Sequence, residues 1–317
     1  MHPLLTAMHF TFGPSGVSFT PEKDIPSLTG KVIFITGGNT GLGKQSVLEL
    51  SRHRPSEIWL AARSLDKAKI AVDDIAKLVP GASIKVLQLD LSSFESIGNA
   101  AKTFLAHSDR LDILLLNAGI MGYAPGLSEE GYEIQFGTNH MGHALLTKLL
   151  MPALLKSAGN HSGARVICLS SDVHKSAPPG GIQFDSLRTK AETMTTMMRY
   201  GQSKLANALF ARELAKQYPQ IIVASVHPGI VDTTLSSVMM GGNMLLRGVR
   251  SLASPFLASV ENGAKNQLWA ATSMDVVSGE YYEPVGVTGK ASACAKDNDL
   301  AKRLWDWTEN ELKAYTV

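Results

Sequence analysis

Short apolar runs alternate with longer helix-like stretches along most of the chain. The runs are rich in valine, isoleucine and leucine, and they predict strands at residues 32–36, 57–61, 83–88, 113–117, 164–170, 222–227 and 279–282. The stretches between them predict helices near residues 43–53, 64–79, 92–107, 131–151, 199–217 and 258–272. Apolar strands without polar alternation are buried on both faces. The pattern therefore predicts an α/β fold, a doubly wound parallel sheet with helices on both faces.

Two segments, at about 174–198 and 233–260, interrupt this alternation. The first contains a Pro-Pro-Gly-Gly sequence at 178–181, and the second is rich in methionine between 239 and 244. Long irregular segments inside a compact domain are commonly binding loops, and methionines would give such a loop an adaptable apolar lining. A tolerated surface insertion would have the same pattern, so both interpretations stay open.

Composition narrows the class of protein. The 317 residues include 30 Lys+Arg and 28 Asp+Glu, for a net charge of +2, with 44% hydrophobic and 18% charged residues. These values exclude a disordered chain, and the lack of a basic cluster gives no electrostatic case for nucleic acid. Length alone suggests about two domains. Because no linker or repeat interrupts the alternation, we expect one domain over residues 30–317, with residues 1–29 as an N-terminal extension on the surface.

Targeting signals are absent from the pattern. Residues 1–29 lack a basic start, and Gly13 and Pro14 break their apolar stretch, which is unlike a signal peptide. No run reaches the roughly 18 apolar residues of a membrane-spanning helix. The sequence therefore predicts a soluble, cytoplasmic protein without a membrane span.

Cysteines and histidines do not predict a metal site. Cys168 and Cys294 lie far apart, and Cys168 belongs to an apolar run typical of a buried strand. His140 and His143 are three residues apart on a predicted helix, but no third ligand has motif spacing. We expect neither a disulfide nor a bound metal.

A glycine-rich turn follows the first predicted strand. It reads Gly37-Gly38-Asn39-Thr40-Gly41-Leu42-Gly43 and leads directly into a predicted helix. Glycine allows a positive φ and a close approach of a ligand to the backbone. A helix N-terminus offers unpaired N–H groups to a pyrophosphate. Such a triplet can be a simple turn, but its place after the first strand of an α/β chain predicts nucleotide binding.

The end of the second predicted strand indicates which nucleotide. An acidic residue there binds a ribose 2′-hydroxyl, whereas an arginine accommodates a 2′-phosphate. This strand is followed by Arg63, with no carboxylate at its tip. We therefore favour NADP(H) over NAD(H), with Asn39 as a second contact to the phosphate. The alternative is that Arg63 is a solvated loop charge.

Further motifs follow in a fixed order. The spacing Thr-Gly-x-x-x-Gly-x-Gly departs from the general dinucleotide fingerprint and resembles the short-chain dehydrogenase/reductase family, whose single-domain members have a Rossmann fold. The later matches are Asp90-Leu91, Asn117-Ala118-Gly119, Asn139, Ser170-Ser171, Tyr200-x-x-x-Lys204 and Pro228-Gly229-Ile230 with Thr233. The Asn139-His140-x-Gly-His143 variant is most similar to the retinol-dehydrogenase-like branch and its fungal relatives.

The resemblance implies a role for each motif. Ser171, the second serine of its pair, holds the substrate oxygen, Lys204 binds the nicotinamide ribose, and Asn139 holds a water that links Lys204 to solvent. Ile230 and Thr233 hold the nicotinamide carboxamide. The implied catalytic set is Asn139, Ser171, Tyr200 and Lys204, and the implied cofactor contacts are Gly37, Asn39, Thr40, Gly41, Leu42, Gly43, Arg63, Asp90, Leu91, Asn117, Ala118, Gly119, Tyr200, Lys204, Pro228, Gly229, Ile230 and Thr233.

Tyr200 and Lys204 are four residues apart on a predicted helix, so both point to one face. A free tyrosine has a pKa of about 10. A nearby ammonium favours the phenolate, so we expect Lys204 to lower the pKa of Tyr200. Tyr200 would then exchange a proton with a carbonyl or alcohol oxygen.

Together these features predict an NADP(H)-dependent oxidoreductase that reduces a ketone or aldehyde of a fairly large apolar molecule, of the secondary-metabolite, steroid or retinoid type. The alternatives are a catalytically inactive NADP-bound sensor or scaffold, and double-bond reduction on the same fold. Many family members pair through the helices that correspond to residues 139–156 and 200–217, which suggests a homodimer. The leucines of these helices could equally pack on the protein's own sheet.

Overall fold

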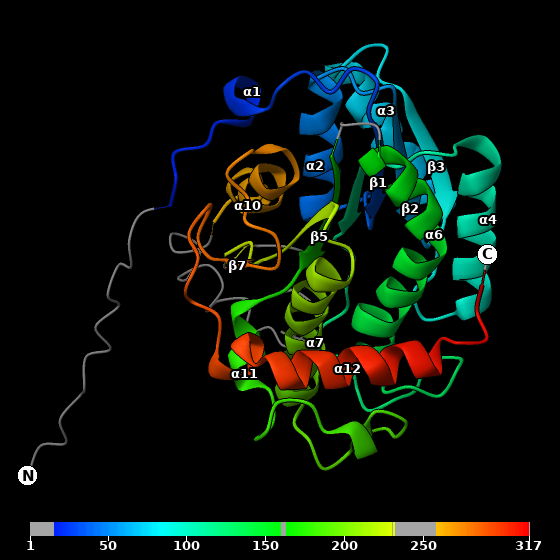
Figure 1. The fold of residues 1–317 in the computed structure, drawn as a ribbon. Helices are drawn as coiled ribbons and strands as arrows, with labels where there is room; N and C mark the ends of the chain where they lie inside the picture. Colours follow the sequence, from blue (N-terminus) through cyan, green and yellow to red (C-terminus); the bar gives the residue numbers. More distant parts are fainter. Residues whose placement is uncertain (1–15, 160–162, 230, 232–257, 317) are drawn as a thin grey trace, which may run out of the picture.

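The computed structural model describes residues 16–159, 163–229, 231 and 258–316. Within these residues, seven strands form one parallel sheet in the order β3-β2-β1-β4-β5-β6-β7 (Figure 1). Each strand lies within two residues of its predicted ends, and the predicted fold class is confirmed. The strands are β1 (Val32–Thr36), β2 (Glu57–Ala62), β3 (Ile84–Gln88), β4 (Ile113–Leu116), β5 (Ala164–Leu169), β6 (Ile221–Val226) and β7 (Tyr281–Tyr282).

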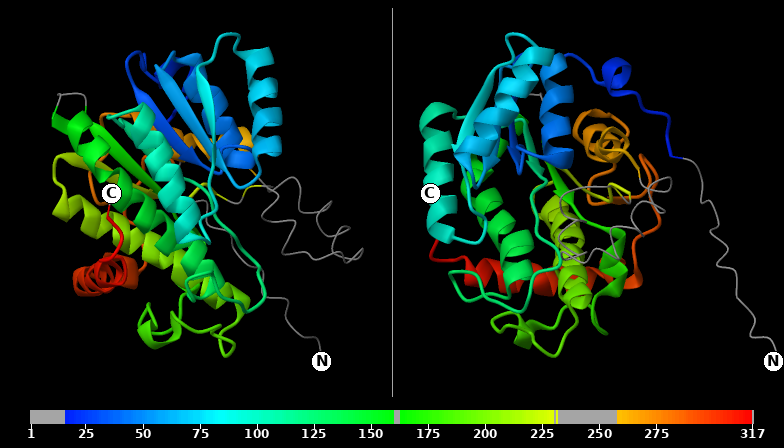
Figure 2. Two further views of the ribbon diagram at one scale, coloured as in Figure 1. Left: turned by 90° about the vertical axis from the view of Figure 1, so that its right-hand side faces the viewer. Right: turned by 180° about the vertical axis from the view of Figure 1, so that it is seen from behind.

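Helices cover both faces of this sheet (Figure 2). Successive residues of a strand point to opposite faces, so Val32 and Phe34 enter one core while Ile33 and Ile35 enter the other. The first core is closed by α4 (Phe94–His107), α6 (Gly142–Gly159) and α7 (Thr196–Gln217). The second is closed by α2 (Gly41–Arg52), α3 (Leu65–Leu78) and α10 (Val260–Thr272).

The helix predicted at 131–151 is not one regular helix. A short helix, α5 (Ile134–Phe136), passes into the π-helical turn Gly137–Met141 and then into α6. A π-turn adds one residue to a helical turn, which apolar periodicity does not reveal. The helix also continues through Pro152, where a proline normally ends one.

A C-terminal helix, α12 (Asn298–Glu311), was not predicted. It crosses the outer side of α7 (Figure 1). Its Leu304 is buried, Trp305 stacks on Phe210 with ring centroids 5.6 Å apart, and Glu309 pairs with Lys148 of α6. The leucines that could pair with a second copy or pack on the sheet are buried inside their own chain, namely Leu145, Leu146, Leu149, Leu150, Leu205 and Leu209, and α12 packs on α7.

The described part of the N-terminal extension packs against the domain. Phe19, Ile25 and Leu28 are buried in the second core, and α1 (Pro21–Asp24) contacts α2 and α10. These three apolar side chains anchor residues 16–29 to the domain, whereas residues 1–15 of the predicted surface extension lie outside the described residues. The N–H of Val17 also donates to the carbonyl of Val285.

The irregular segment at 174–198 is built into the fold. It contains the 3-10 turns Asp172–Ser176 and Phe184–Ser186, and Leu187 is fully buried in the first core. Phe184 lies under the guanidinium of Arg303 from α12. The segment is therefore anchored to the first core by Ile182 and Leu187, while most of its other residues are half-buried or exposed. Of the second irregular segment, residues 233–257 lie outside the described residues.

Candidate active site

Tyr200 and Lys204 lie on α7 and are both buried. The ammonium of Lys204 is 5.7 Å from the centre of the Tyr200 ring, as expected from their spacing. Its Nζ donates to the carbonyl of Leu169, the last residue of β5, at 2.9 Å. Lys204 is thus anchored at the carboxyl end of a central strand, the edge where α/β sheets bind their ligands.

Ser171 follows β5 by two residues and reaches the same place. Its hydroxyl lies close enough to the Tyr200 side chain to favour the phenolate, and it accepts the N–H of Val173 at 3.2 Å. Ser170 instead donates to the backbone carbonyl of Lys204 at 2.8 Å. Of the two serines, Ser171 is therefore the one that faces Tyr200, and Ser170 anchors α7 to the strand.

Asn139 lies in the π-helical turn and is fully buried. Its Oδ1 accepts the N–H of Ile120 at 2.8 Å, and its Nδ2 donates to the Ile120 carbonyl and to Ser203. A Cβ on Gly119 would lie 3.1 Å from Asn139 Oδ1 and 3.3 Å from Lys204 Nζ. Because Gly119 has no side chain, Asn139 Oδ1 and Lys204 Nζ can both lie beside its Cα.

Burial controls the ionisation of both catalytic candidates on α7. It lowers the pKa of Lys204 to about 8 and raises the pKa of Tyr200 above its usual value, although the Ser171 hydroxyl opposes the rise. The expected lowering of the Tyr200 pKa by Lys204 is wrong for the protein alone. The reason is that burial removes water from the phenolate, which raises the pKa of Tyr200 more than the ammonium of Lys204, held on the Leu169 carbonyl, can lower it. Tyr200 consequently keeps its proton at neutral pH.

The glycine turn connects β1 to α2 with the geometry that its sequence indicates. Gly37 and Gly41 have φ values of +67° and +52°. A Cβ on Gly43 would lie 2.2 Å from the Gly37 carbonyl oxygen, so only glycine fits there. Thr40 precedes the helix but its side chain makes no capping hydrogen bond. The first turn of α2 therefore presents its N–H groups at the carboxyl edge of the sheet.

Arg63 directly follows β2 and is exposed. Its guanidinium forms no ion pair or hydrogen bond with any residue that the structure describes. Asn39, within the glycine turn, is half-buried. The two residues lie after neighbouring strands β2 and β1, whose carboxyl ends meet at the same edge.

Two motif residues, Asn117 and Asp90, form side-chain hydrogen bonds with other residues of the protein. Asn117 donates from Nδ2 to the Thr36 carbonyl at 2.9 Å and accepts from Gln267 of α10, which ties the end of β4 to the glycine turn. Asp90 accepts the N–H and hydroxyl of Ser92. These contacts shape the backbone around the turn.

The remaining predicted residues fall into two groups. Ala118 and Gly119 follow β4, and Leu91 is buried against Gly142 at the start of α6. Pro228 and Gly229 follow β6, whereas Ile230 and Thr233 lie outside the described residues.

His143 was predicted to be part of a family motif and not a metal ligand, and its hydrogen bonds within the site were not predicted. The Thr36 hydroxyl accepts the N–H groups of Asn117 and Ala118. It donates its own proton to His143 Nε2 at 2.9 Å, which is nearer than the Leu115 carbonyl at 3.4 Å. His143 Nδ1 therefore carries the ring proton and donates to the Asn139 carbonyl at 3.0 Å. Burial lowers the pKa of His143 to about 3. A neutral histidine thus joins the glycine turn to Asn139.

Clusters of metal ligands and membrane-spanning helices are both absent from the described ranges. In that part of the chain, no group of three or more His, Cys, Asp or Glu side chains is arranged to hold a metal ion. The same residues include no helix with the length and apolar character to cross a membrane.

Comparison with known proteins agrees with the geometry. Residues 31–240 match the model of the short chain dehydrogenase family. The short-chain dehydrogenase/reductase drtF of Aspergillus calidoustus is 38% identical, over 91% of this chain and 96% of its own. Retinol dehydrogenase 13 of Homo sapiens is 37% identical, over 88% of this chain and 83% of its own. A crystal structure of an uncharacterized protein from Mycobacterium paratuberculosis superimposes with a TM-score of 0.71 at 28% identity, over 92% and 97% of the two chains.

These matches extend over nearly the whole domain and include both groups of relatives that the Asn139–His143 motif resembles. The chain belongs to the short-chain dehydrogenase/reductase family of oxidoreductases, in the branch of the retinol dehydrogenases and their fungal relatives.

Proposed function

We propose that the protein is an NADP(H)-dependent carbonyl reductase in which Tyr200 supplies the proton. The observation that carries this proposal is the buried group formed by Ser171, Tyr200 and Lys204 at the carboxyl end of β5. NADPH, when bound, supplies the hydride. The protein holds the carbonyl compound and delivers the proton, and positioning accounts for most of its contribution.

The three side chains divide this work. The Ser171 hydroxyl hydrogen-bonds the substrate oxygen and keeps it beside the Tyr200 hydroxyl. Tyr200 transfers its proton to that oxygen as negative charge develops there. Lys204 holds the ribose hydroxyls and, as a cation, stabilises the phenolate that remains. We keep the water relay from Asn139 to Lys204 as a prediction, with Asn139 Oδ1 and Lys204 Nζ meeting beside Gly119.

The protonated state of Tyr200 supports reduction as the working direction. Burial keeps the proton on Tyr200 at neutral pH. A carbonyl that gains hydride needs this proton donor, whereas oxidation of an alcohol needs the phenolate. We expect alcohol oxidation to become faster only as the pH rises.

The residues of the glycine turn fit a dinucleotide. The uncapped first turn of α2 would bind the pyrophosphate, because its N–H groups have no side-chain partner. The free guanidinium of Arg63 and the amide of Asn39 would bind the 2′-phosphate of NADP(H). Gly37, Gly41 and Gly43 leave room for the phosphates, and Pro228 and Gly229 would border the nicotinamide.

Arg63→Ala tests the cofactor. A charge-assisted hydrogen bond contributes about 1.5–3 kcal/mol, so the Kd for NADPH should rise roughly ten- to a hundredfold. The Kd for NADH should stay within about twofold of wild type, since NADH has no 2′-phosphate. Fluorescence titration measures both constants. Lys69→Ala, which removes an exposed cation of α3, is the matched control, and equal losses for NADPH and NADH on Arg63→Ala would contradict the phosphate contact.

Gly43→Ala tests the turn itself. The added Cβ would overlap the Gly37 carbonyl oxygen, so the turn must open and lose its shape. We expect NADPH binding to fall below detection and the thermal midpoint to drop. Gly98→Ala is the matched control, because Gly98 lies in α4 with no atom near its would-be Cβ. That change should stabilise the protein by about 0.5–1 kcal/mol. Unchanged NADPH affinity in Gly43→Ala would refute the proposed cradle.

The substrate that we propose is a fairly large apolar ketone or aldehyde, of the secondary-metabolite, steroid or retinoid type. The names of the retinol dehydrogenase relatives support this class. A panel of such carbonyls, followed by NADPH absorbance and product analysis, tests the proposal. An alcohol product supports it, a reduced double bond favours the alternative reduction, and no turnover favours an inactive sensor or scaffold.

A further inference from the structure

Arg199 lies directly before Tyr200 and is among the largest side chains that the described residues bury completely. Its Nη1 donates to Glu133 Oε1 at 2.9 Å, and the two side chains are 1% and 0% exposed. Removing two charges from water is costly. Replacing a buried ion pair with apolar side chains of similar volume often leaves the protein as stable or makes it more stable. Stability therefore does not explain why this pair occupies the interior next to the active site.

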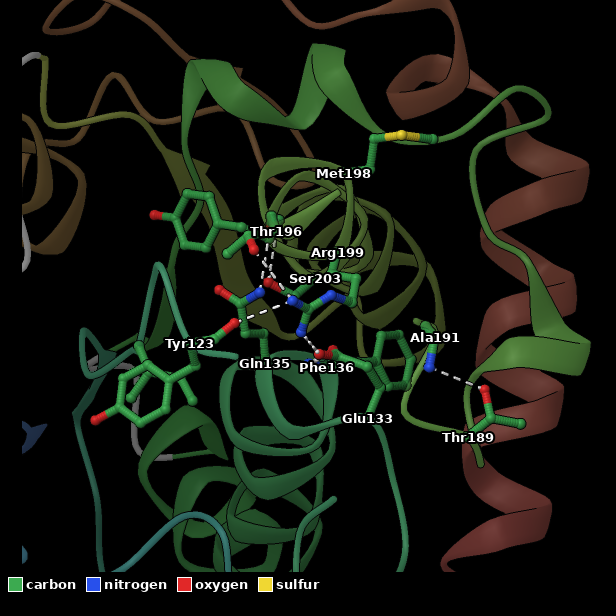
Figure 3. Close-up of polar contacts among 12 residues, drawn as sticks. Tyr123, Glu133, Gln135, Phe136, Thr189, Ala191, Thr196, Met198, Arg199 and Ser203 are labelled. Carbon is green, nitrogen blue, oxygen red and sulfur yellow. Dashed lines mark hydrogen bonds and ion pairs between the residues drawn. The ribbon is translucent and has the colours of Figure 1, made fainter. Parts of the chain in front are cut away.

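The pair joins three segments that meet at the site (Figure 3). Arg199 Nη2 donates to the Tyr123 carbonyl at 3.0 Å and to the Thr196 hydroxyl at 3.2 Å. Glu133 uses its second oxygen to accept the N–H of Phe136 at 2.7 Å, which caps α5. One buried charge pair thus connects the loop at 120–123, the helix that leads to Asn139, and the first turn of α7.

Two neighbouring side chains bind the same loop. Gln135 accepts the N–H of Gly122 and donates to the Thr196 carbonyl, both at 3.1 Å. Asn139 holds Ile120 at its N–H and its carbonyl. The backbone of the loop is therefore attached at three successive places, and Arg199 supplies the charged one.

The loop at 120–123 lies close to the catalytic side chains, so the hydrogen bonds that hold it also affect the site. It continues from β4 past Gly119, which lies beside Lys204 Nζ, so it borders the edge where the sheet binds its ligands. Tyr123 is 37% exposed at its far end. The substrate oxygen must reach Tyr200 and Ser171 from this side of the sheet.

We propose that Arg199, held by Glu133, is a positioning residue that fixes the loop at 120–123 as one wall of the substrate site and sets its distance from the Tyr200 hydroxyl. The inference rests on the proposed carbonyl reduction for its catalytic consequence. Its structural part, that the pair holds the loop, stands independently of the reaction.

Arg199→Lys separates charge from geometry. Lysine keeps the ion pair with Glu133, but its single ammonium cannot also reach the Tyr123 carbonyl in the way that a guanidinium fork does. We expect a folded protein whose Kd for NADPH is unchanged and whose kcat is lower by about ten- to a hundredfold, because small displacements of reacting groups are costly. Amide hydrogen exchange in residues 120–123 should become faster, while exchange in β1 stays as in wild type.

A double variant covers the case in which Arg199→Lys fails to fold. Glu133→Gln/Arg199→Met removes both charges, and glutamine keeps an acceptor for the Phe136 N–H. It should fold, with faster exchange in residues 120–123 and a reduced kcat. Lys148→Met/Glu309→Gln neutralises the ion pair between α6 and α12 and is the matched control, with wild-type kcat and exchange expected.

The two readouts distinguish this inference from the function on which it rests. Wild-type exchange in residues 120–123 of both Arg199 variants would overturn the claim that the pair holds the loop. Faster exchange with unchanged kcat would overturn its role in positioning. A wild-type protein that reduces no carbonyl would refute the proposed function, and the exchange experiment would still decide whether Arg199 holds the loop.

Discussion

Tyr200→Phe is expected to lower kcat for carbonyl reduction by about 10²- to 10⁴-fold, the range typical of a lost general acid. The phenyl ring keeps the packing of this buried residue but has no proton to give. Among the described residues, the hydroxyl has one polar interaction that bears on its ionisation, with Ser171. Its loss should therefore cost only about 1 kcal/mol of stability. The measurement is NADPH absorbance under single-turnover conditions, with the Kd for NADPH determined in parallel.

Tyr218→Phe is the matched control for this variant. Tyr218 lies at the C-terminal end of the same helix, against Trp305 and far from Ser171. It should keep wild-type turnover. Equal turnover of wild type and Tyr200→Phe would show that the proton comes from another group.

Lys204→Met is expected to stabilise the cofactor-free protein while it removes activity. Burial lowers the pKa of Lys204 from 10.5 to about 8. At about 1.4 kcal/mol per pH unit, the buried cation costs roughly 3 kcal/mol of folding free energy at neutral pH. Methionine has a similar length and no charge, and Asn207 still donates to the Leu169 carbonyl at 3.1 Å. After the loss of one hydrogen bond of about 1 kcal/mol, we expect a net gain of about 2 kcal/mol at pH 7.

The pH dependence of this gain has a defined sign. Lys204 loses its proton near pH 8 when folded and near 10.5 when unfolded, so the unfolded chain binds more protons between these values. Wild-type stability therefore recovers as the pH rises from 8 to 10.5, and the advantage of Lys204→Met should shrink over that interval. Urea unfolding at pH 7 and pH 10 measures it. A variant that is less stable than wild type at pH 7 would contradict the cost of the buried cation.

The same lowered pKa predicts how wild-type activity responds to pH. Above about pH 8 the free enzyme loses the Lys204 cation that stabilises the phenolate. We therefore expect kcat/KM for NADPH to fall as the pH rises through that value.

The sheet was predictable from sequence because its central strands β1, β4 and β5 are buried on both faces and are therefore almost entirely apolar. The approach of Ser171 to Tyr200 was also predictable, since a parallel sheet places the end of β5 beside the helix that precedes β6. α12 was not predicted although its sequence carries a helical signal, since Leu300, Ala301, Leu304 and Leu312 recur at helical spacing and pack on the first core. The π-turn around Asn139 was missed because one inserted residue leaves no mark on the pattern of apolar positions.

The chemistry of single side chains was harder to predict than their location. The expected effect of Lys204 on Tyr200 considered only the neighbouring charge, and desolvation reversed its direction. Asn117 and Asp90 stay predicted cofactor contacts, and spacing did not reveal that their side chains also form hydrogen bonds with Thr36 and Ser92. The role of His143 depends on two partners, Thr36 at the end of β1 and Asn139 in the π-helical turn, which spacing along the chain does not reveal.

Transfer of deuterium tests the central claim most directly. The protein is incubated with NADPH that carries deuterium at nicotinamide C4 and with a panel of apolar ketones and aldehydes, and the products are analysed by mass spectrometry and NMR. We predict an alcohol with the deuterium on the carbinol carbon, formed by wild type and nearly absent with Tyr200→Phe. Deuterium on a carbon of a former double bond, or NADPH consumption without labelled alcohol, would contradict the assignment as a carbonyl reductase.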